Sequence, residues 1–250
     1  MPSPARSRRR WRPEAALLLA ATVVGAVVPA GCTGGLPTRG SGTVVDSQRE
    51  VGSFDALSVD SGVAVSLATG AEPSVVVRAD DNVQDLLRAE VDSGTLTLWV
   101  DGPVSAATLE VTVTVPADAL ERISLDGGSS LTDTEALTAA DLAVELDGAS
   151  RAFLVLAAGE VEVDANGASV LNAVGTASGL DVSADGASSV QVSELTVGRA
   201  SVDARGGSRV HLTATDSLEA SASGGSTISF GGDPPDVTQD AEQGSTIQAD

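Results

Sequence analysis

One copy of a pattern that recurs along the second half of this 250-residue chain reads Val163-Asp164-Ala165-Asn166-Gly167-Ala168-Ser169-Val170-Leu171. Each copy contains a triplet, which we call a corner, that ends in serine and contains at least one glycine. Successive corner serines lie 21, 19, 19, 20, 18 and 19 residues apart. The seven serines are Ser129, Ser150, Ser169, Ser188, Ser208, Ser226 and Ser245. A period near 20 residues indicates a repeat architecture whose units stack on one another.

Alternating polarity on both sides of the corner predicts strands. In the quoted copy Val163 and Ala165 are apolar and Asp164 between them is polar, and most other copies keep this order. Leu171, two residues after the serine, is also in an apolar column. Alternation with period two is typical of a strand with one buried face. The sequence therefore predicts an all-β fold, a β-solenoid (β-helix) of short stacked strands with Gly-rich corners and about 19 residues per coil.

The corner residues fit this interpretation. A sharp bend often needs a positive φ, which glycine adopts without steric cost. The serine has the same inward parity as the aliphatic residues, so we expect its hydroxyl to bond to corner backbone groups or to stacked neighbours. This structural role is favoured over that of a nucleophile.

Residues 54–116 follow the same alternation more loosely and predict further short strands. One segment differs, because Val83, Leu86 and Leu87 have helical spacing and Asn82 is a candidate cap. We therefore expect a helix over residues 82–89. About 200 residues at this period predict on the order of ten coils.

Several segments, taken in order, resemble the GIN domain, the family described as the head domain of autotransporter adhesins. The resemblance covers about residues 49–250. It implies a β-helical fold and an adhesive role, and it brings no catalytic residues. The segments are Val51-Gly52-Ser53-Phe54-Asp55-Ala56-Leu57-Ser58-Val59, Asp81-Asn82-Val83, Leu96-Thr97-Leu98, Val113-Thr114-Val115-Pro116 and the corners.

The N-terminus is typical of an export signal. Five arginines precede an apolar run over residues 15–28, which is too short to span a bilayer, and small residues follow. Val28-Pro29-Ala30-Gly31-Cys32 resembles the lipobox of bacterial lipoproteins but has Pro29 where an aliphatic residue is usual. We expect a signal peptide over residues 1–31, lipidation of Cys32, a flexible tether over residues 32–48 and the solenoid domain over residues 49–250. Ordinary signal peptidase cleavage near Cys32 is the alternative.

These features predict a protein that is exported and held by its N-terminal lipid on the outer face of the cytoplasmic membrane or at the cell surface. Nucleic acid is not an expected partner, because the net charge is −21 and the arginines outside the first dozen residues are scattered. Ile247 lies close to the last residue of the sequence, so a second subunit, as in a homo-oligomer, could cover the last coil.

The strand after each corner is predicted to present an almost uncharged face. One outward column holds Phe153, Asn172, Gln191 and His211, a strip of aromatic, amide and imidazole groups on successive coils. These are the candidate ligand-binding residues, for a glycan, an envelope polymer or a protein. The alternative is an ordinary solvated face.

The strand before each corner is predicted to present an acidic face. Asp164, Asp185 and Asp203 lie on neighbouring coils and are the candidate metal ligands, since calcium prefers oxygen ligands. No cofactor is otherwise expected. The alternative function is a structural or sensory envelope module that binds calcium or a regulatory partner through the acidic face.

Catalysis is the third hypothesis and has little support. His211, the one histidine, has outward parity and the corner serines inward parity, so no serine and base are predicted to meet. A glycan-processing pair of carboxylates among Asp164, Asp185 and Asp203 stays open by spacing. We expect a binding protein, not an enzyme.

Overall fold

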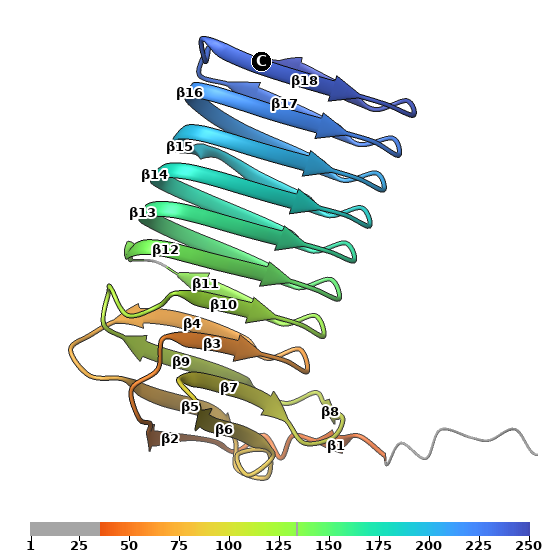
Figure 1. The fold of residues 1–250 in the computed structure, drawn as a ribbon. Coiled ribbons are helices and arrows are strands. Elements are labelled where there is room, and N and C mark those ends of the chain that lie inside the picture. The colour runs from red at the N-terminus through yellow and green to blue at the C-terminus, as the bar shows by residue number, and fades with distance from the viewer. Residues whose placement is uncertain (1–35, 134) are drawn as a thin grey trace, which may run out of the picture. The chain divides into compact units, whose positions relative to one another are not determined.

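The computed structural model describes residues 36–133 and 135–250, and every regular element in these ranges is a β-strand (Figure 1). The predicted signal peptide, residues 1–31, and Cys32 lie outside the described residues. Within these ranges, no helix is long and apolar enough to cross a membrane. The described chain confirms the predicted all-β solenoid, with about 7 turns of roughly 19 residues.

The second half of the chain forms the regular coils, each made of a strand before a corner, the corner and a strand after it (Figure 1). From β13 to β16 the strand after one corner continues through a bend into the strand before the next. The strands are β10 (Arg122–Leu125), β11 (Ser130–Asp133), β12 (Leu137–Leu146), β13 (Arg151–Ala165), β14 (Val170–Ala184), β15 (Ser189–Ala204), β16 (Arg209–Ala222), β17 (Thr227–Gly231), β18 (Asp236–Ala241) and β19 (Thr246–Ala249).

Neighbouring coils pair in parallel and in the register that the repeat predicts. Val163 of β13 lies opposite Val144 of β12 and Val182 of β14, and Leu171 lies opposite Ala152 and Val190. The inward columns are therefore continuous from coil to coil. They form one hydrophobic core of Val, Leu and Ala side chains, nearly all of them inaccessible to solvent.

The corners are tight turns whose two central residues have positive φ. Gly186 and Ala187 have φ values of 67° and 72°, and the other corners follow the same geometry. In the six corners with glycine at the first central position, an added Cβ would meet the neighbouring coil. At Gly186 it would lie 3.1 Å from the backbone nitrogen of Gly167. The last corner has Gln243 at this position. The second position is open in Gly128, where an added Cβ has nothing within 4 Å, so this position accepts glycine or alanine.

The corner serines have the predicted structural role. Those from Ser129 to Ser226 are at most 1% exposed. Ser188 Oγ donates a hydrogen bond to the Asp185 carbonyl at 2.7 Å, which closes its own corner. Ser226 Oγ accepts one from the Gly207 N–H of the neighbouring coil at 3.2 Å. These hydroxyls thus satisfy backbone groups within and between corners, whereas the buried hydroxyls of Ser150 and Ser208 have no hydrogen-bond partner among the described residues.

The first half of the chain covers the β10 end of these coils with a mixture of parallel and antiparallel pairs. The strands are β1 (Thr38–Arg39), β2 (Val44–Glu50), β3 (Ala56–Val59), β4 (Ala64–Thr69), β5 (Ser74–Asp80), β6 (Leu87–Asp92), β7 (Thr95–Val100), β8 (Val104–Ser105) and β9 (Leu109–Val115).

Strands β3 and β4 form one more coil, which pairs in parallel with β10 and β11 although it precedes them by more than 60 residues. Its corner is Asp60-Ser61-Gly62-Val63, in which the buried Val63 occupies the serine position. On its other side β3 pairs with β7 and β4 pairs with β9. Residues 70–121 are thus inserted between two coils that are adjacent in space.

The insertion explains why the chain has about seven turns rather than the predicted ten. Strands β2 and β5, β5 and β9, and β6 and β7 pair antiparallel, so residues 70–121 do not add regular coils. Residues 44–48, predicted as tether, lie in β2 and pair with β5.

The predicted helix over residues 82–89 is wrong. Residues 81–86 are turns and Leu87 begins β6. Strand β6 forms a hairpin with β7 through Ser93-Gly94, which have φ values of 50° and 84° as such two-residue turns require. Val83 and Leu87 are buried in this arrangement, so tertiary packing uses the apolar residues without a helix.

Side-chain contacts hold this first part of the domain together. The Asp80 carboxylate is 2% exposed and accepts hydrogen bonds from the Gly42 and Thr108 N–H groups, both at 2.6 Å. Asp80 therefore ties together three segments of the chain.

A second contact is the ion pair between Arg88 and Asp101. Arg88 donates to Asp101 at 2.7 Å, and this hydrogen bond lowers the pKa of Asp101 and raises that of Arg88.

Candidate functional site

Each regular coil presents two outward faces. The post-corner face consists of the outward residues of β11, β17, β19 and the first halves of β13–β16. The pre-corner face consists of the outward residues of β10, β18 and the second halves of β12–β16. The same backbone register sets both faces, so residues at equal distance from a corner serine form straight columns.

The structure brings the four predicted ligand-binding residues into one column of the post-corner face. Phe153 lies opposite Asn172, Asn172 opposite Gln191, and Gln191 opposite His211. Adjacent strands are about 4.8 Å apart, so the four side chains span three such steps. Phe153 is 39% exposed and is one of the few large apolar side chains exposed among the described residues. The other three are half-buried.

Local hydrogen bonds orient the polar members of this column. Gln191 Nε2 donates to Ser189 Oγ of its own strand at 3.2 Å. His211 Nε2 lies 2.8 Å from Asp250 Oδ2, a pairing that is charged when the imidazole is protonated. The side chains of Gln191 and His211 are therefore held in place, and Asn172 lies between Phe153 and Gln191 in the same column.

Three half-buried valines adjoin Phe153 on the same face. Val155 and Val174 lie opposite each other two residues further along β13 and β14, and Val170 lies opposite Arg151. With Phe153 they form a small apolar patch on a flat sheet surface. The sequence prediction was limited to the Phe153 column, but the same alternation predicts the Val155 and Val174 column if it is extended by two residues.

The two outward columns nearest the corners carry little charge on this face. From β11 to β19 they contain Arg151, Arg209 and His211 and no carboxylate. A face with an exposed aromatic ring, amides and few charges suits contact with the flat face of a sugar ring or with a protein surface.

The three predicted metal ligands lie on the pre-corner face but are not brought together. Asp164 and Asp203 share a column with Ser183 between them, so they are two coils apart. Asp185 lies at a corner, where its Oδ1 accepts the Gly186 N–H at 2.6 Å, and Asp203 pairs with Arg205. Among residues 36–133 and 135–250 no three His, Cys, Asp or Glu side chains are grouped to hold a metal ion. The geometry therefore gives the calcium hypothesis no support.

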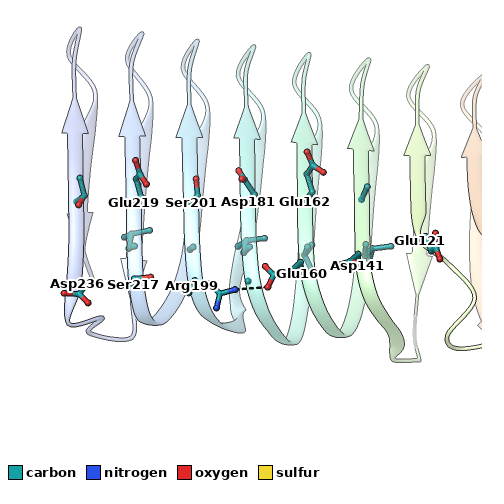
Figure 2. A pocket seen from close by; sticks show the side chains of 18 of the residues that line it. Glu121, Asp141, Glu160, Glu162, Asp181, Arg199, Ser201, Ser217, Glu219 and Asp236 are labelled. Atoms are coloured by element: carbon teal, nitrogen blue, oxygen red, sulfur yellow. Dashed lines mark hydrogen bonds and ion pairs between the residues drawn. The ribbon is translucent and has the colours of Figure 1, made fainter.

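A groove of about 880 Å³ follows the bend side of the pre-corner face across several coils (Figure 2). Most of its wall residues lie in two outward columns, seven and nine residues before the corner serines, and its floor includes Leu142, Val161, Leu180 and Leu218. Seven of the lining residues are carboxylates and two are arginines, Arg122 and Arg199. The carboxylates are Glu121, Asp141, Glu160, Glu162, Asp181, Glu219 and Asp236.

One ion pair runs along one wall of the groove. Arg199 Nη2 of β15 donates to Glu160 Oε1 of β13 at 2.8 Å, and Gly179 of β14 occupies the register position between them (Figure 2). A Cβ at Gly179 would lie 1.8 Å from Glu160 Oε2, so glycine leaves the room that the Glu160 carboxylate fills. The pair is largely exposed to solvent.

The acidic face predicted before each corner includes one wall of this groove. Glu162, Asp181 and Glu219 lie seven residues before their corner serines and have the same outward parity as Asp164, Asp185 and Asp203. The other wall, with Asp141, Glu160, Arg199 and Asp236, lies nine residues before the serines and was not predicted, although one further step of the same alternation assigns these residues outward.

Comparisons with known proteins agree on the family and the fold. The family model described as "Putative auto-transporter adhesin, head GIN domain" matches residues 53–234. No curated protein matches the chain.

Several solved structures have this fold. A "putative adhesin" from Bacteroides fragilis superposes with a TM-score of 0.80 at 19% identity, covering 85% of this chain and 99% of the other. A "putative lipid binding protein" from Parabacteroides distasonis has a TM-score of 0.70 at 16% identity, covering 86% and 100%. A "putative adhesin" from Parabacteroides merdae has a TM-score of 0.67 at 17% identity, covering 85% and 98%. These similarities show the fold, and the descriptions name adhesins and a lipid-binding protein rather than enzymes.

Proposed function

The chain belongs to the family of the "Putative auto-transporter adhesin, head GIN domain", and we propose from this premise that it is the binding head of an exported lipoprotein. The post-corner face is the binding surface, and a glycan, an envelope polymer or a protein at the cell surface is the ligand. The single observation that carries this proposal is the column of Phe153, Asn172, Gln191 and His211 on a face with few charges.

The column offers two kinds of contact. The Phe153 ring and the adjoining valines can cover the apolar face of a sugar ring or an aliphatic patch of a protein. The amides of Asn172 and Gln191 supply donors and acceptors at about 4.8 Å spacing for the hydroxyl or peptide groups beside it. All of these residues lie on paired strands, so little conformational entropy is lost when a ligand binds.

Export and anchoring complete the proposal. The basic start, the apolar run over residues 15–28 and the lipobox-like segment before Cys32 support secretion and lipidation of Cys32. Acyl chains contribute about 0.8 kcal/mol per buried CH₂, and two or more of them anchor a protein stably. The head is thus held near the cell surface, where a weak binding face can act at high local concentration.

Replacing Phe153 and Gln191 together by alanine is expected to weaken ligand binding at least tenfold. The double variant removes the aromatic contact and one amide, and truncation of two central contact residues commonly costs more than 1.4 kcal/mol, which corresponds to tenfold. The purified protein is first screened on arrays of glycans, envelope polymers and surface proteins. The affinity of the best ligand is then measured by calorimetry, with and without a chelator.

The matched control is the Thr246→Ala and Gln248→Ala double variant on the same face. Gln248 belongs to the same column but lies on the last coil, away from Phe153. This control is expected to change the affinity less than twofold. If both double variants bind like the parent, the ligand does not use this column. If the chelator abolishes binding, the calcium alternative replaces the proposal.

A further inference from the structure

We propose that the acidic groove of the pre-corner face is a second interaction surface, which binds an extended basic segment of a partner polypeptide. The groove lies on the pre-corner face, whereas the Phe153 column lies on the post-corner face. Its function therefore does not depend on the ligand of the post-corner face.

The groove has acidic walls on either side of a narrow floor. Leu142, Val161, Leu180 and Leu218 lie at this floor but point into the core, and only 2–4% of each residue is exposed. The wall side chains therefore supply the groups that a ligand can reach, and lysine and arginine complement them because their long side chains carry the charged end to a carboxylate.

Charge complementarity selects a cationic occupant. Seven carboxylates and two arginines line the groove, and one of these arginines is already paired with Glu160. Repeating carboxylates on coils about 4.8 Å apart repel one another, and a bound row of cations relieves that repulsion. A second copy of this chain is a poor occupant, because its net charge is −21.

Arg199 shows how the groove accommodates a guanidinium. Its side chain extends from β15 toward β13 and bonds to Glu160 across Gly179 (Figure 2). The groove thus already contains one pair of the kind that a partner's arginine would form. Arginine of a partner can reach Glu162, Asp181 or Glu219, whose carboxylates make no ion pair among the described residues.

The axial repeat of the groove suits a polypeptide in an extended helix. A polyproline II segment advances about 9.3 Å every three residues. Two coils advance about 9.6 Å. Basic residues three positions apart would therefore meet Asp181 and Glu219, which lie two coils apart in one column, without strand pairing to the protein.

The test uses a labelled twelve-residue peptide with arginine at every third position and proline elsewhere, and a control peptide with glutamate in place of arginine. Fluorescence anisotropy at low and at physiological salt gives the dissociation constant with the whole protein. The arginine peptide is expected to bind and the glutamate peptide not to bind. Absence of arginine-peptide binding at low salt would overturn the proposal.

Two triple variants separate the groove from general electrostatic attraction. Glu162→Gln/Asp181→Asn/Glu219→Gln neutralises one wall of the groove and is expected to weaken peptide binding at least tenfold. Glu145→Gln/Asp164→Asn/Asp240→Asn removes the same charge from the same face outside the groove, and is expected to weaken it less than threefold. Equal losses in the two triple variants would overturn the proposal.

A second pair of variants tests for a gain in peptide affinity. Arg199→Ala frees Glu160 and is expected to tighten peptide binding at least twofold. Arg205→Ala makes the same charge change at a corner outside the groove, where Arg205 pairs with Asp203, and is expected to have a smaller effect. If spermine binds in the groove but the peptide does not, the site takes polyamines and the polypeptide assignment is wrong.

Discussion

Replacing Gly186 by valine is expected to lower the free energy of unfolding by about 2–4 kcal/mol. Gly186 has a φ of 67°, which a β-branched side chain resists. An added Cβ would also lie 3.1 Å from the nitrogen and 3.4 Å from the Cα of Gly167 in the neighbouring coil. The backbone of two stacked corners would have to move apart, which would weaken the hydrogen bonds between them.

Ala187→Gly is the matched control at the next position of the same corner. Ala187 has a φ of 72°, so glycine relieves backbone strain there and creates no contact with the coil beneath. We expect this variant to be unchanged or stabilised by up to about 1 kcal/mol. Urea denaturation followed by circular dichroism measures both variants. Equal stability of Gly186→Val and the parent would mean that the corners do not stack as described.

Replacing Leu154 by alanine is expected to cost about 2–5 kcal/mol of stability, the range for a buried leucine that leaves a cavity. Leu154 is fully buried and lies in an inward column next to Ala173. Its neighbour Phe153 points outward and is 39% exposed. Phe153→Ala is therefore expected to cost less than about 1 kcal/mol.

These two adjacent residues test the alternation that defines both faces. Thermal and urea denaturation of the two single variants give the comparison directly. A larger loss for Phe153→Ala than for Leu154→Ala would reverse the assignment of inward and outward residues. The same measurement shows whether the Phe153 variant used for binding is folded.

The regular coils could be predicted because their information is local and repeated. Six of the seven corners place a glycine where positive φ and close stacking demand it, and alternation on both sides then assigns the side chains to the core or to a face. The Phe153, Asn172, Gln191 and His211 column follows from the repeat spacing alone, despite the irregular pairing after Asn172.

The first half of the domain could not be predicted in the same way. The corner Asp60-Ser61-Gly62-Val63 has valine where the others have serine, and its partner strands in β10 and β11 are far away in the sequence. Local spacing around Val83 and Leu87 indicates a helix, but the antiparallel pairing of β6 with β7 places these residues in the core without one. Non-local pairing decides both cases.

The groove was missed for a different reason. Its second wall obeys the same alternation and spacing, but it lies nine residues before the corner serines, next to the bend of the coil and one step beyond the columns that were assigned. Gly179 has an ordinary position in the sequence pattern. Its role becomes clear only when Glu160 and Arg199 are seen on either side of it.

Distances between spin labels test most directly whether the chain stacks coil upon coil in this register. Pairs of cysteines in a Cys32→Ser background carry the labels at Ser66 and at Gln191, Ser229 or Gln248, which are four, six and seven steps along one column. At about 4.8 Å per step, the predicted backbone separations are roughly 19, 29 and 34 Å. Double electron–electron resonance distances that increase in this proportion support the stacked columns. Distances from Ser66 that do not increase from Gln191 to Gln248 would contradict them.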